Sequence, residues 1–289
     1  MFFQMKKLEL VNVIAFILLF IFAIIPLIAG LGYAIMYSLG FANTLSNGFT
    51  LDNYSKLFND HSLIQNFGYT IILSIISLGI TVVLSLGISL QFQSYFRKGM
   101  MSYLVNLPLS FPAIVGAFFF FQFLSSGGIL ARLFYKFGLI NSISQFPNLI
   151  NDQWSIGIIV TQTFISCPFF ILLFSNIYKN QQIAEYLNLS YTLGANKFSA
   201  SFKIAAPIML NKSLPTLFLY FIFKLGTYEI PLLLGQSNPE TISVMAVRKL
   251  QRFNLLDIPQ GYAVAVLYAF LVGILLIVYF KLSKQYNEI

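Results

Sequence analysis

Residues 181–217 read QQIAEYLNLSYTLGANKFSASFKIAAPIMLNKSLPTL, and long apolar runs lie on both sides of them. The stretch is too polar to cross a bilayer. It also has internal order, because a helix-forming run is followed by Gly194 and Ala195, and an apolar run then ends at Pro207. Loops that only connect two spans seldom carry such a pattern of helix formers and helix breakers. The stretch therefore predicts a structured element that a soluble partner could bind.

The composition places the chain among membrane proteins. Of its 289 residues, 58% are hydrophobic and only 9% are charged, whereas a soluble domain carries about 25% charged residues. Six apolar runs have the roughly 20 residues that a helix needs to cross a bilayer. We therefore expect an all-α membrane protein with one domain over residues 1–289. The expected spans are about 11–37, 65–92, 104–124, 155–177, 214–234 and 261–280.

The basic residues predict the orientation of the spans. With six spans both termini lie on one side, and that side collects ten basic residues against six on the other. The positive-inside rule then places both termini and residues 181–217 in the cytoplasm. The ten are Lys6, Lys7, Arg97, Lys98, Lys179, Lys197, Lys203, Lys212, Lys281 and Lys284, and the six are Lys56, Arg132, Lys136, Arg248, Lys249 and Arg252.

Several function classes find no support in the residues. The single Cys167 allows neither an intrachain disulfide nor a cysteine metal cluster, and the lone His61, in a polar setting, is expected to be a solvated loop histidine. There is no P-loop, HExxH or GxSxG motif, so we expect no catalytic and no metal-binding residues. The net charge of +8 is divided among the segments that flank the spans, where it sets topology and contacts lipid, so we expect no nucleic-acid partner.

The apolar positions of residues 181–193 lie at helical spacing. Tyr186, Leu189 and Leu193 recur at i, i+3 and i+7, which places them on one face of a helix. Gly194 accepts the positive φ that ends a helix, so two short helices joined at Gly194 would form an elbow. The apolar face could fill a groove on a partner, or the helix could lie on the membrane surface.

The same stretch resembles the cytoplasmic signature of the permeases of binding-protein-dependent ABC importers, which reads EAA, three residues, G, nine residues, then I-x-L-P. Gly194, Ile204 and Pro207 are in register with that signature. The three positions of EAA are occupied by Asn188, Leu189 and Ser190, and Ala206 replaces the usual leucine. Asparagine offers an acceptor and two donors without charge, so docking here would depend more on shape and apolar contact.

Other segments are similar to the spermidine/putrescine and sulfate branch of these permeases, so that the resemblance covers about residues 10–281. The family pattern of Asn-Tyr in the first polar loop, then Asn and Thr opening the second span, is present. The matching segments are Asn53 and Tyr54, Asn66 and Thr70, LPLSFPAIVGAFFFF at Leu107–Phe121, and YEIPLLLG at Tyr228–Gly235.

The resemblance implies a permease subunit with no enzymatic activity of its own, in a bacterial cell (inner) membrane. Its partners would be a second homologous permease, a cytoplasmic ATPase dimer that binds ATP and Mg, and an external solute-binding protein. No cofactor is expected in this chain. The coupling region would be residues 181–207, and the residues expected to contact the ATPase are Asn188, Leu189, Ser190, Leu193, Gly194, Ala195, Ile204 and Pro207.

The fifth span contains the charged residues Lys224 and Glu229. A charge inside a span is costly and indicates a functional site. A polyamine could contact Glu229 by charge and Tyr228 by cation–π attraction, so we take these three residues as candidates for the translocation pathway, with a structural role of Glu229 as the alternative. The motif at Tyr228–Gly235 favours a polyamine-like organic solute, with sulfate, a carbohydrate, thiamine or ferric iron as alternatives. From other classes, a membrane enzyme would need a convergent catalytic cluster, and an assembly protein would need no motif.

Overall fold

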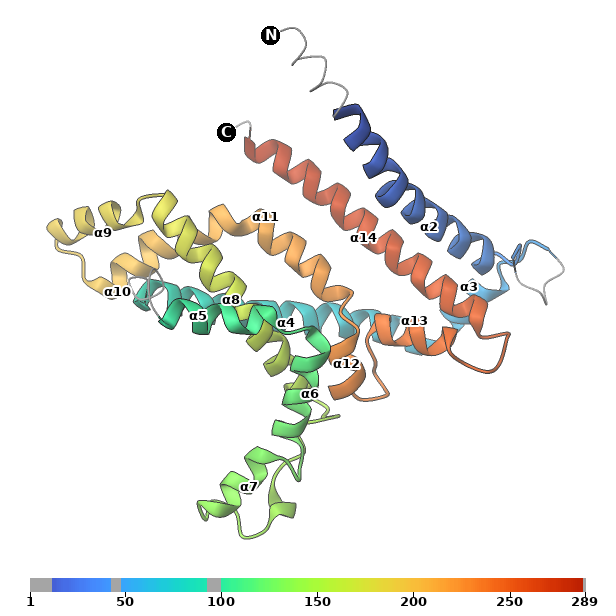
Figure 1. Ribbon diagram of the computed structural model, residues 1–289, viewed down its shortest axis with the longest axis horizontal. Coiled ribbons are helices and arrows are strands. Elements are labelled where there is room, and N and C mark those ends of the chain that lie inside the picture. Colours follow the sequence, from blue (N-terminus) through green and yellow to red (C-terminus); the bar gives the residue numbers. More distant parts are fainter. Residues whose placement is uncertain (1–11, 43–47, 93–99, 288–289) are drawn as a thin grey trace, which may run out of the picture. The chain divides into compact units, whose positions relative to one another are not determined.

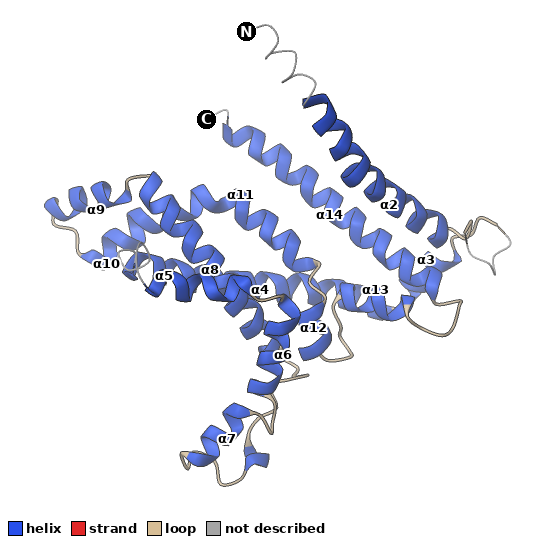
Figure 2. Ribbon diagram, viewed as in Figure 1, coloured by secondary structure: helices blue, strands red, loops and turns tan. Residues whose placement is uncertain are grey.

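The structure is a computed structural model and describes residues 12–42, 48–92 and 100–287. All regular secondary structure in these residues is helical (Figures 1 and 2). The all-helical fold is confirmed, and six described helices are long and apolar enough to be candidate membrane spans. The six are Asn12–Ser38, His61–Phe92, Ala113–Lys136, Ile156–Asn180, Lys197–Leu225 and Ile258–Lys281. The predicted basic residues Lys6, Lys7, Arg97 and Lys98 lie outside the described residues.

Figure 1 labels helices α2 to α14, and the helical segments of the described residues follow here in chain order. They are η1 (Phe20–Ile24), α2 (Ile25–Ser38), α3 (Asp52–Asn59), α4 (His61–Phe92), α5 (Met100–Asn106), η3 (Leu107–Ser110), α6 (Ala113–Leu124), α7 (Ile129–Lys136), η4 (Ile143–Gln145), α8 (Ile156–Asn180), α9 (Ile183–Thr192), α10 (Lys197–Ala200), η5 (Ser201–Ala205), α11 (Ala206–Leu225), α12 (Glu229–Leu234), α13 (Ile242–Leu250) and α14 (Ile258–Asn287). The segments η1 and η5 are π-helical turns, and η3 and η4 are short 3₁₀ helices.

The chain divides into two compact units. The first comprises residues 1–63 and 245–273, and the second comprises residues 64–244 and 274–289. In the first unit the ring of Tyr262 from α14 packs against Tyr33 and Tyr37 from α2, at centroid distances of 5.7 and 4.5 Å. These contacts fix α2 to the beginning of α14. The candidate sites below lie in the second unit.

The third span differs from the predicted range 104–124. This range contains parts of α5, η3 and α6, because the chain is extended at Phe111 before α6 begins. Pro112 accounts for the break, since proline has no N–H to donate and disfavours helical backbone at the residue before it. The candidate span is Ala113–Lys136, which joins α6 to α7.

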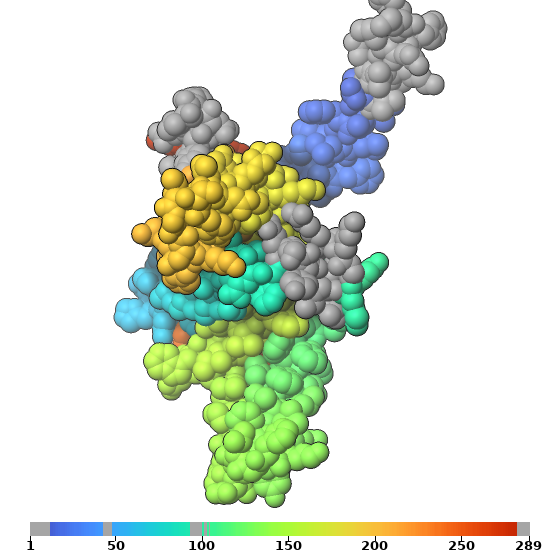
Figure 3. Space-filling view, turned by 90° about the vertical axis from the view of Figure 1, so that its left-hand side faces the viewer, coloured from blue at the N-terminus to red at the C-terminus, as the bar shows by residue number. Residues whose placement is uncertain are grey.

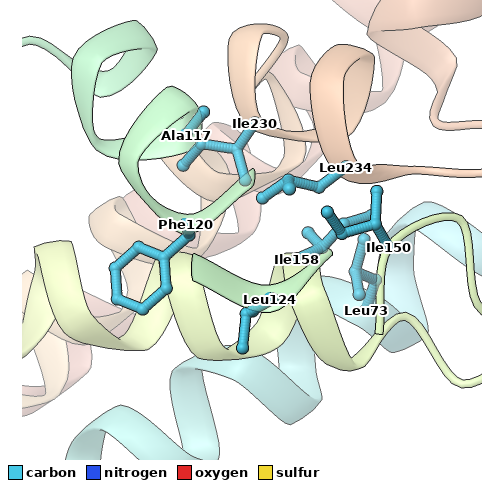
Figure 4. Packing of buried hydrophobic residues seen from close by; sticks show 8 residues of the cluster. All are labelled: Leu73, Ala117, Phe120, Leu124, Ile150, Ile158, Ile230 and Leu234. Carbon is cyan, nitrogen blue, oxygen red and sulfur yellow. The ribbon is translucent and has the colours of Figure 1, made fainter. Parts of the chain in front are cut away.

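Two hydrophobic clusters hold the second unit together. The first joins α4, α6, α8 and α12, and Figure 4 shows its members: Leu73, Ala117, Phe120, Leu124, Ile150, Ile158, Ile230 and Leu234. Helices α6 and α8 come so close that a Cβ added at Gly116 would lie 2.7 Å from Ile165 Cδ1. The second cluster joins α4 and α8 to the region of α9, α10 and α11. Its members are Leu86, Phe170, Phe174, Ile183, Leu187, Ala200, Ala205 and Met209.

A row of small hydroxyl residues lets α4 lie against α8. Thr81 Oγ1 donates to the carbonyl of Ser77 at 2.6 Å, and Ser85 Oγ lies 2.6 and 3.2 Å from the carbonyl oxygens of Thr81 and Cys167. Ser89 Oγ donates to the carbonyl of Ile171 at 3.2 Å. Small residues of this kind allow close approach of membrane helices, and their hydroxyls are satisfied by backbone carbonyls. The row positions α4 and α8 for the polar cluster described below.

Candidate functional site

Gly194 forms the elbow that ends α9. Its φ is +87°, in the left-handed region that glycine adopts readily. Its N–H donates to the carbonyl of Tyr191 at 3.0 Å, and the N–H of Ala195 donates to the carbonyl of Ser190 at 3.0 Å. This pair of hydrogen bonds is the Schellman motif, which satisfies carbonyls that would otherwise lack a partner at the helix end.

The elbow continues directly into a long helix. Asn196 is the N-cap of α10, and its Oδ1 accepts a hydrogen bond from the N–H of Ser199 at 2.7 Å. From there Lys197–Leu225 forms one helix through α10, η5 and α11. Of the two short helices expected at Gly194, only α9 is short; the second is the beginning of the fifth span. The π turn η5 lies just before Pro207. In a regular α-helix the proline ring would clash with the carbonyl of the preceding turn.

Helix α9 has one buried and one exposed side. Ile183 and Leu187 are buried in the second cluster, with relative exposures of 0% and 7%. Tyr186, Leu189 and Leu193 lie on the other side with exposures of 53%, 63% and 83%. The spacing of the three residues thus corresponds to one exposed face, as the periodicity predicts. Asn188 is exposed on α9, while Ser190 is buried and its Oγ donates to the carbonyl of Leu187 at 2.7 Å.

The apolar surface continues onto the first turns of the long helix. Phe198 and Phe202 are largely exposed, and their rings stack at a centroid distance of 6.0 Å. Figure 3 shows the α9 and α10 region on the face toward the viewer. Among the other predicted coupling residues, Pro207 is exposed, and Ala195 and Ile204 are half-buried. We call the five most exposed large apolar side chains of this region the apolar elbow surface: Tyr186, Leu189, Leu193, Phe198 and Phe202.

The predicted fifth span, 214–234, is two helices. Helix α11 ends at Leu225 and α12 begins at Glu229. Gly226 is the C-cap of α11. Pro231 is the third residue of α12 and lies in its first turn. Proline is tolerated there because the backbone N–H groups of the first turn have no acceptor within the helix. A continuous helix through this point would place the ring of Pro231 against the carbonyl four residues earlier, so the break belongs before it.

Lys224 is buried beside this break and joins three helices. Its exposure is 3%, and its Nζ donates to Ser77 Oγ of α4 at 3.3 Å. Ser77 Oγ donates to Gln162 Oε1 of α8 at 2.8 Å, and Gln162 Nε2 donates to Thr227 Oγ1 at 3.0 Å. We call these four residues the Lys224 cluster. Lys224 thus lies inside the second unit, where its hydrogen bonds connect α11 to α4 and α8.

Thr227 fixes the non-helical backbone of the break. Its Oγ1 donates to the carbonyl of Lys224 at 2.9 Å, and its own carbonyl accepts from Ser243 Oγ at 2.6 Å. Glu229 is exposed and Tyr228 is half-buried, so neither shares the setting of Lys224. The structure separates the three predicted pathway residues into one buried cation and two residues at the beginning of α12.

Comparison with known proteins finds sequence similarity to transport permeases. No protein-family model matches it. The spermidine/putrescine transport system permease protein PotB of Salmonella typhimurium is 22% identical over 293 residues, covering 99% of this chain and 96% of PotB. PotB of Haemophilus influenzae is 25% identical over 282 residues, covering 95% and 93% of the two chains. A chain in the crystal structure of a bacterial ABC transporter involved in the import of the acidic polysaccharide alginate has the same fold, with a TM-score of 0.71, 18% identity and 98% coverage of both chains.

Over nearly its full length the chain is similar to permeases of binding-protein-dependent ABC importers, and its fold is that of an ABC importer permease. It is a multi-pass membrane protein and not itself an enzyme; in this family ATP is bound by partner ATPase subunits and the permease carries no cofactor. MalF, the maltose/maltodextrin permease of Vibrio vulnificus, is 25% identical over 213 residues, which cover 69% of this chain and 40% of MalF.

The polar residues near the second span of this permease hold backbone segments in place. Asn66 Oδ1 accepts from the N–H of Glu240 at 3.1 Å, and Thr70 Oγ1 accepts from the N–H of Ile242 at 3.0 Å. In the first unit, Asn53 Nδ2 donates to the carbonyl of Ser38 at 2.9 Å. The residues that carried the resemblance in this region therefore form hydrogen bonds between segments that are distant in sequence.

The histidine and cysteine of the permease have no part in a metal centre among the described residues, which contain no group of three metal-binding side chains. His61 is exposed, but it is the first residue of α4 and not a loop residue. Cys167 lies on α8, where its Sγ is 3.3 Å from Ser85 Oγ.

Sequence reasoning missed four residues of these sites. Ser77, Gln162 and Thr227 complete the Lys224 cluster, and Asn196 caps the helix after the elbow. A glutamine within an apolar run is a signal that could have identified Gln162. An asparagine that follows Gly194 and precedes a helical run is a common N-cap signal, and it could have identified Asn196.

Proposed function

We propose that this permease forms the solute pathway of an ATP-driven importer and binds its cytoplasmic ATPase through the apolar elbow surface. One observation carries the proposal. Five large apolar side chains are exposed on α9 and the first turns of the long helix, next to an elbow that two backbone hydrogen bonds hold in a defined shape. An amphipathic helix that presents apolar anchors on one face is a common way to fill a groove on a partner protein.

The helix after the elbow gives such a docking site a mechanical connection to the bundle. Lys197–Leu225 is one helix of 29 residues, about 40 Å long at about 1.5 Å per residue. It begins at the apolar elbow surface and ends beside the Lys224 cluster. Movement of a bound ATPase would therefore reach the break at Gly226 through one continuous helix, and packed helices are among the elements that carry coupling between distant sites.

The orientation belongs to the same proposal. We place both termini and the elbow in the cytoplasm, with Lys197 and Lys203 exposed beside the apolar surface. The remaining partners are a second homologous permease, an ATPase dimer that binds ATP and Mg, and an external solute-binding protein, in a bacterial cell (inner) membrane. The competing role for α9, a helix resting on the membrane surface, makes a different prediction for the experiment below.

Two observations bear on the solute. The relatives matched over their full length are named for spermidine and putrescine, which favours a polyamine-like organic solute. The second candidate, an anionic solute, is favoured by the buried Lys224 of this chain. MalF is named for maltose and maltodextrin, and the solved transporter for an acidic polysaccharide.

Leu193→Glu tests the docking role. Leu193 is 83% exposed, so the change should not affect folding, but a carboxylate in an apolar groove should weaken ATPase binding. We expect the ATPase rate stimulated by the importer's binding protein to fall at least about tenfold, the scale of an interface hot spot. The measurement uses the complete importer in proteoliposomes and the amount of ATPase that purifies with the permease.

Leu193→Met is the matched control, because it keeps an apolar side chain of similar size, and it should retain both quantities. A stimulated rate unchanged by Leu193→Glu would contradict docking at this surface. Retention of the ATPase together with weaker membrane association of α9 would favour the membrane-surface role instead.

A further inference from the structure

The Lys224 ammonium is surrounded by neutral groups. Its exposure is 3%. An ammonium can donate three hydrogen bonds, and the one that Lys224 makes within the described part of the chain is to Ser77 Oγ at 3.3 Å. The Tyr220 ring lies 5.9 Å from Nζ, within the range of a cation–π contact. Among the described residues Lys224 forms no salt bridge with a carboxylate, and the described Glu229, five residues later, is exposed.

Such a charge is unusual in a membrane bundle. Buried charges are normally paired, because an isolated ion in a medium of low dielectric constant is costly. Ionisable residues within spans therefore mark solute or ion pathways by default. While it carries its charge, Lys224 lacks a counter-charge among the described residues, and a bound anionic solute is one group that could supply it.

The backbone next to Lys224 is not helical. Helix α11 ends one residue after Lys224, and residues 226–228 are non-helical up to α12. Non-helical backbone at membrane depth is tolerated where protein covers it or where it lines a cavity, and broken helices in transporters lie at solute sites. Ser77 of α4, Gln162 of α8 and Thr227 of the break form a chain of hydrogen bonds that begins at the Lys224 ammonium.

We propose that Lys224 is a selectivity residue for an anionic group of the transported solute, exposed to the pathway when α11 and α12 separate at Gly226. The inference rests on the proposed permease function and names its substrate class. An ammonium attracts carboxylate and sulfate groups as a point charge. The hydroxyl and amide groups around Lys224 could form further hydrogen bonds with the oxygens of such a group. In the conformation of this structure the site is closed, since Lys224 is buried by its own chain.

The same charge opposes a polyamine. A cationic solute that passed the break would meet the ammonium in surroundings of low dielectric constant, where like charges repel far more strongly than in water. Glu229 could attract such a solute, but it is exposed at the beginning of α12 while Lys224 lies at the centre of the cluster. The local electric field at the break therefore decides between the two solute classes.

Charged thiol reagents measure that field without knowledge of the solute. The only cysteine, Cys167, is first replaced by serine, and Tyr228→Cys places one thiol at the break. The rates of modification by anionic sulfonatoethyl and cationic trimethylammonioethyl methanethiosulfonate are compared in the complete importer, with and without ATP and Mg. We expect Lys224→Gln to lower the anion-to-cation rate ratio about tenfold, the scale of a unit charge acting across a partly buried site, and Lys224→Arg to preserve it.

An unchanged ratio in Lys224→Gln would overturn the proposal, and so would a lack of reaction with both reagents in every nucleotide state, because the break would then not reach water. Accumulation of labelled putrescine that survives Lys224→Gln would also overturn it. Uptake of labelled sulfate is compared with uptake of labelled galacturonate, and the compound that is taken up shows whether the solute is inorganic or a carboxylate. Either uptake should be lost in Lys224→Gln. Failure of ATPase docking gives a different pattern, because Leu193→Glu leaves the reagent ratio intact.

Discussion

The apolar elbow surface and the Lys224 cluster lie at opposite ends of one helix and invert the usual rule of polarity. At the first end, large apolar side chains such as Leu193 are exposed; at the second, a lysine is buried among neutral groups. Each arrangement is unfavourable in an isolated chain, since exposed apolar clusters and unpaired buried charges both carry a free-energy cost. We therefore propose different partners for the two ends, a protein surface at one and a charged solute at the other.

The largest effect is expected from breaking the elbow itself. Gly194→Pro is incompatible with the φ of +87° and removes the N–H that donates to Tyr191. Proline fixes φ near −65°, so α9 would detach from the long helix or the backbone would be strained by about 3 kcal/mol. We expect loss of the binding-protein-stimulated ATPase rate, measured in proteoliposomes, while the Lys224 end of the helix is unaffected.

Gly194→Asn is the matched control for the elbow, because asparagine tolerates the left-handed conformation better than other side chains. It should keep most of the stimulated rate. If Gly194→Pro were as active as Gly194→Asn, coupling would not require an ordered elbow. The role proposed for the elbow end of the helix would then be contradicted.

The two ends also differ in how far the sequence could predict them. The elbow depends on residues adjacent in the chain, so Gly194 and the spacing of Tyr186, Leu189 and Leu193 predicted its shape. The Lys224 cluster joins residues up to 147 positions apart, and no local pattern indicates which serine of α4 meets which lysine. The limits of the third and fifth spans were missed for a related reason, because hydropathy continues across Pro112 and Gly226 while the helices do not.

An intermediate effect is expected inside the Lys224 cluster. Ser77→Ala removes the acceptor of the ammonium and the donor to Gln162. Loss of a partner for a buried polar group costs about 1–3 kcal/mol, to be measured as the free energy of unfolding in mixed micelles. Lys224→Met alone should be neutral or stabilising, because replacing a buried charge by an apolar side chain of similar volume removes its desolvation cost.

The double variant sharpens this prediction. If Ser77 stabilises the permease mainly by solvating Lys224, Ser77→Ala should cost about 1 kcal/mol less in the Lys224→Met background, since contacting residues are coupled. If the changes in unfolding free energy of the two single variants simply add up in the double variant, Ser77 and Lys224 act independently. The four residues would then not form an energetically coupled cluster.

The smallest effect concerns the junction from which the long helix starts. Asn196→Ala removes the side-chain oxygen that accepts from the N–H of Ser199, and loss of such an N-cap costs about 1 kcal/mol. Because the first turn would fray while α9 and its Schellman motif stay intact, we expect a partial fall in the stimulated ATPase rate and no change in the thiol-reagent ratio at the break. Asn196→Asp restores an N-cap acceptor and should recover the rate. If Asn196→Ala altered the reagent ratio as much as Lys224→Gln does, the two ends of the helix would not be separable, and the field at the break would depend on the state of the elbow.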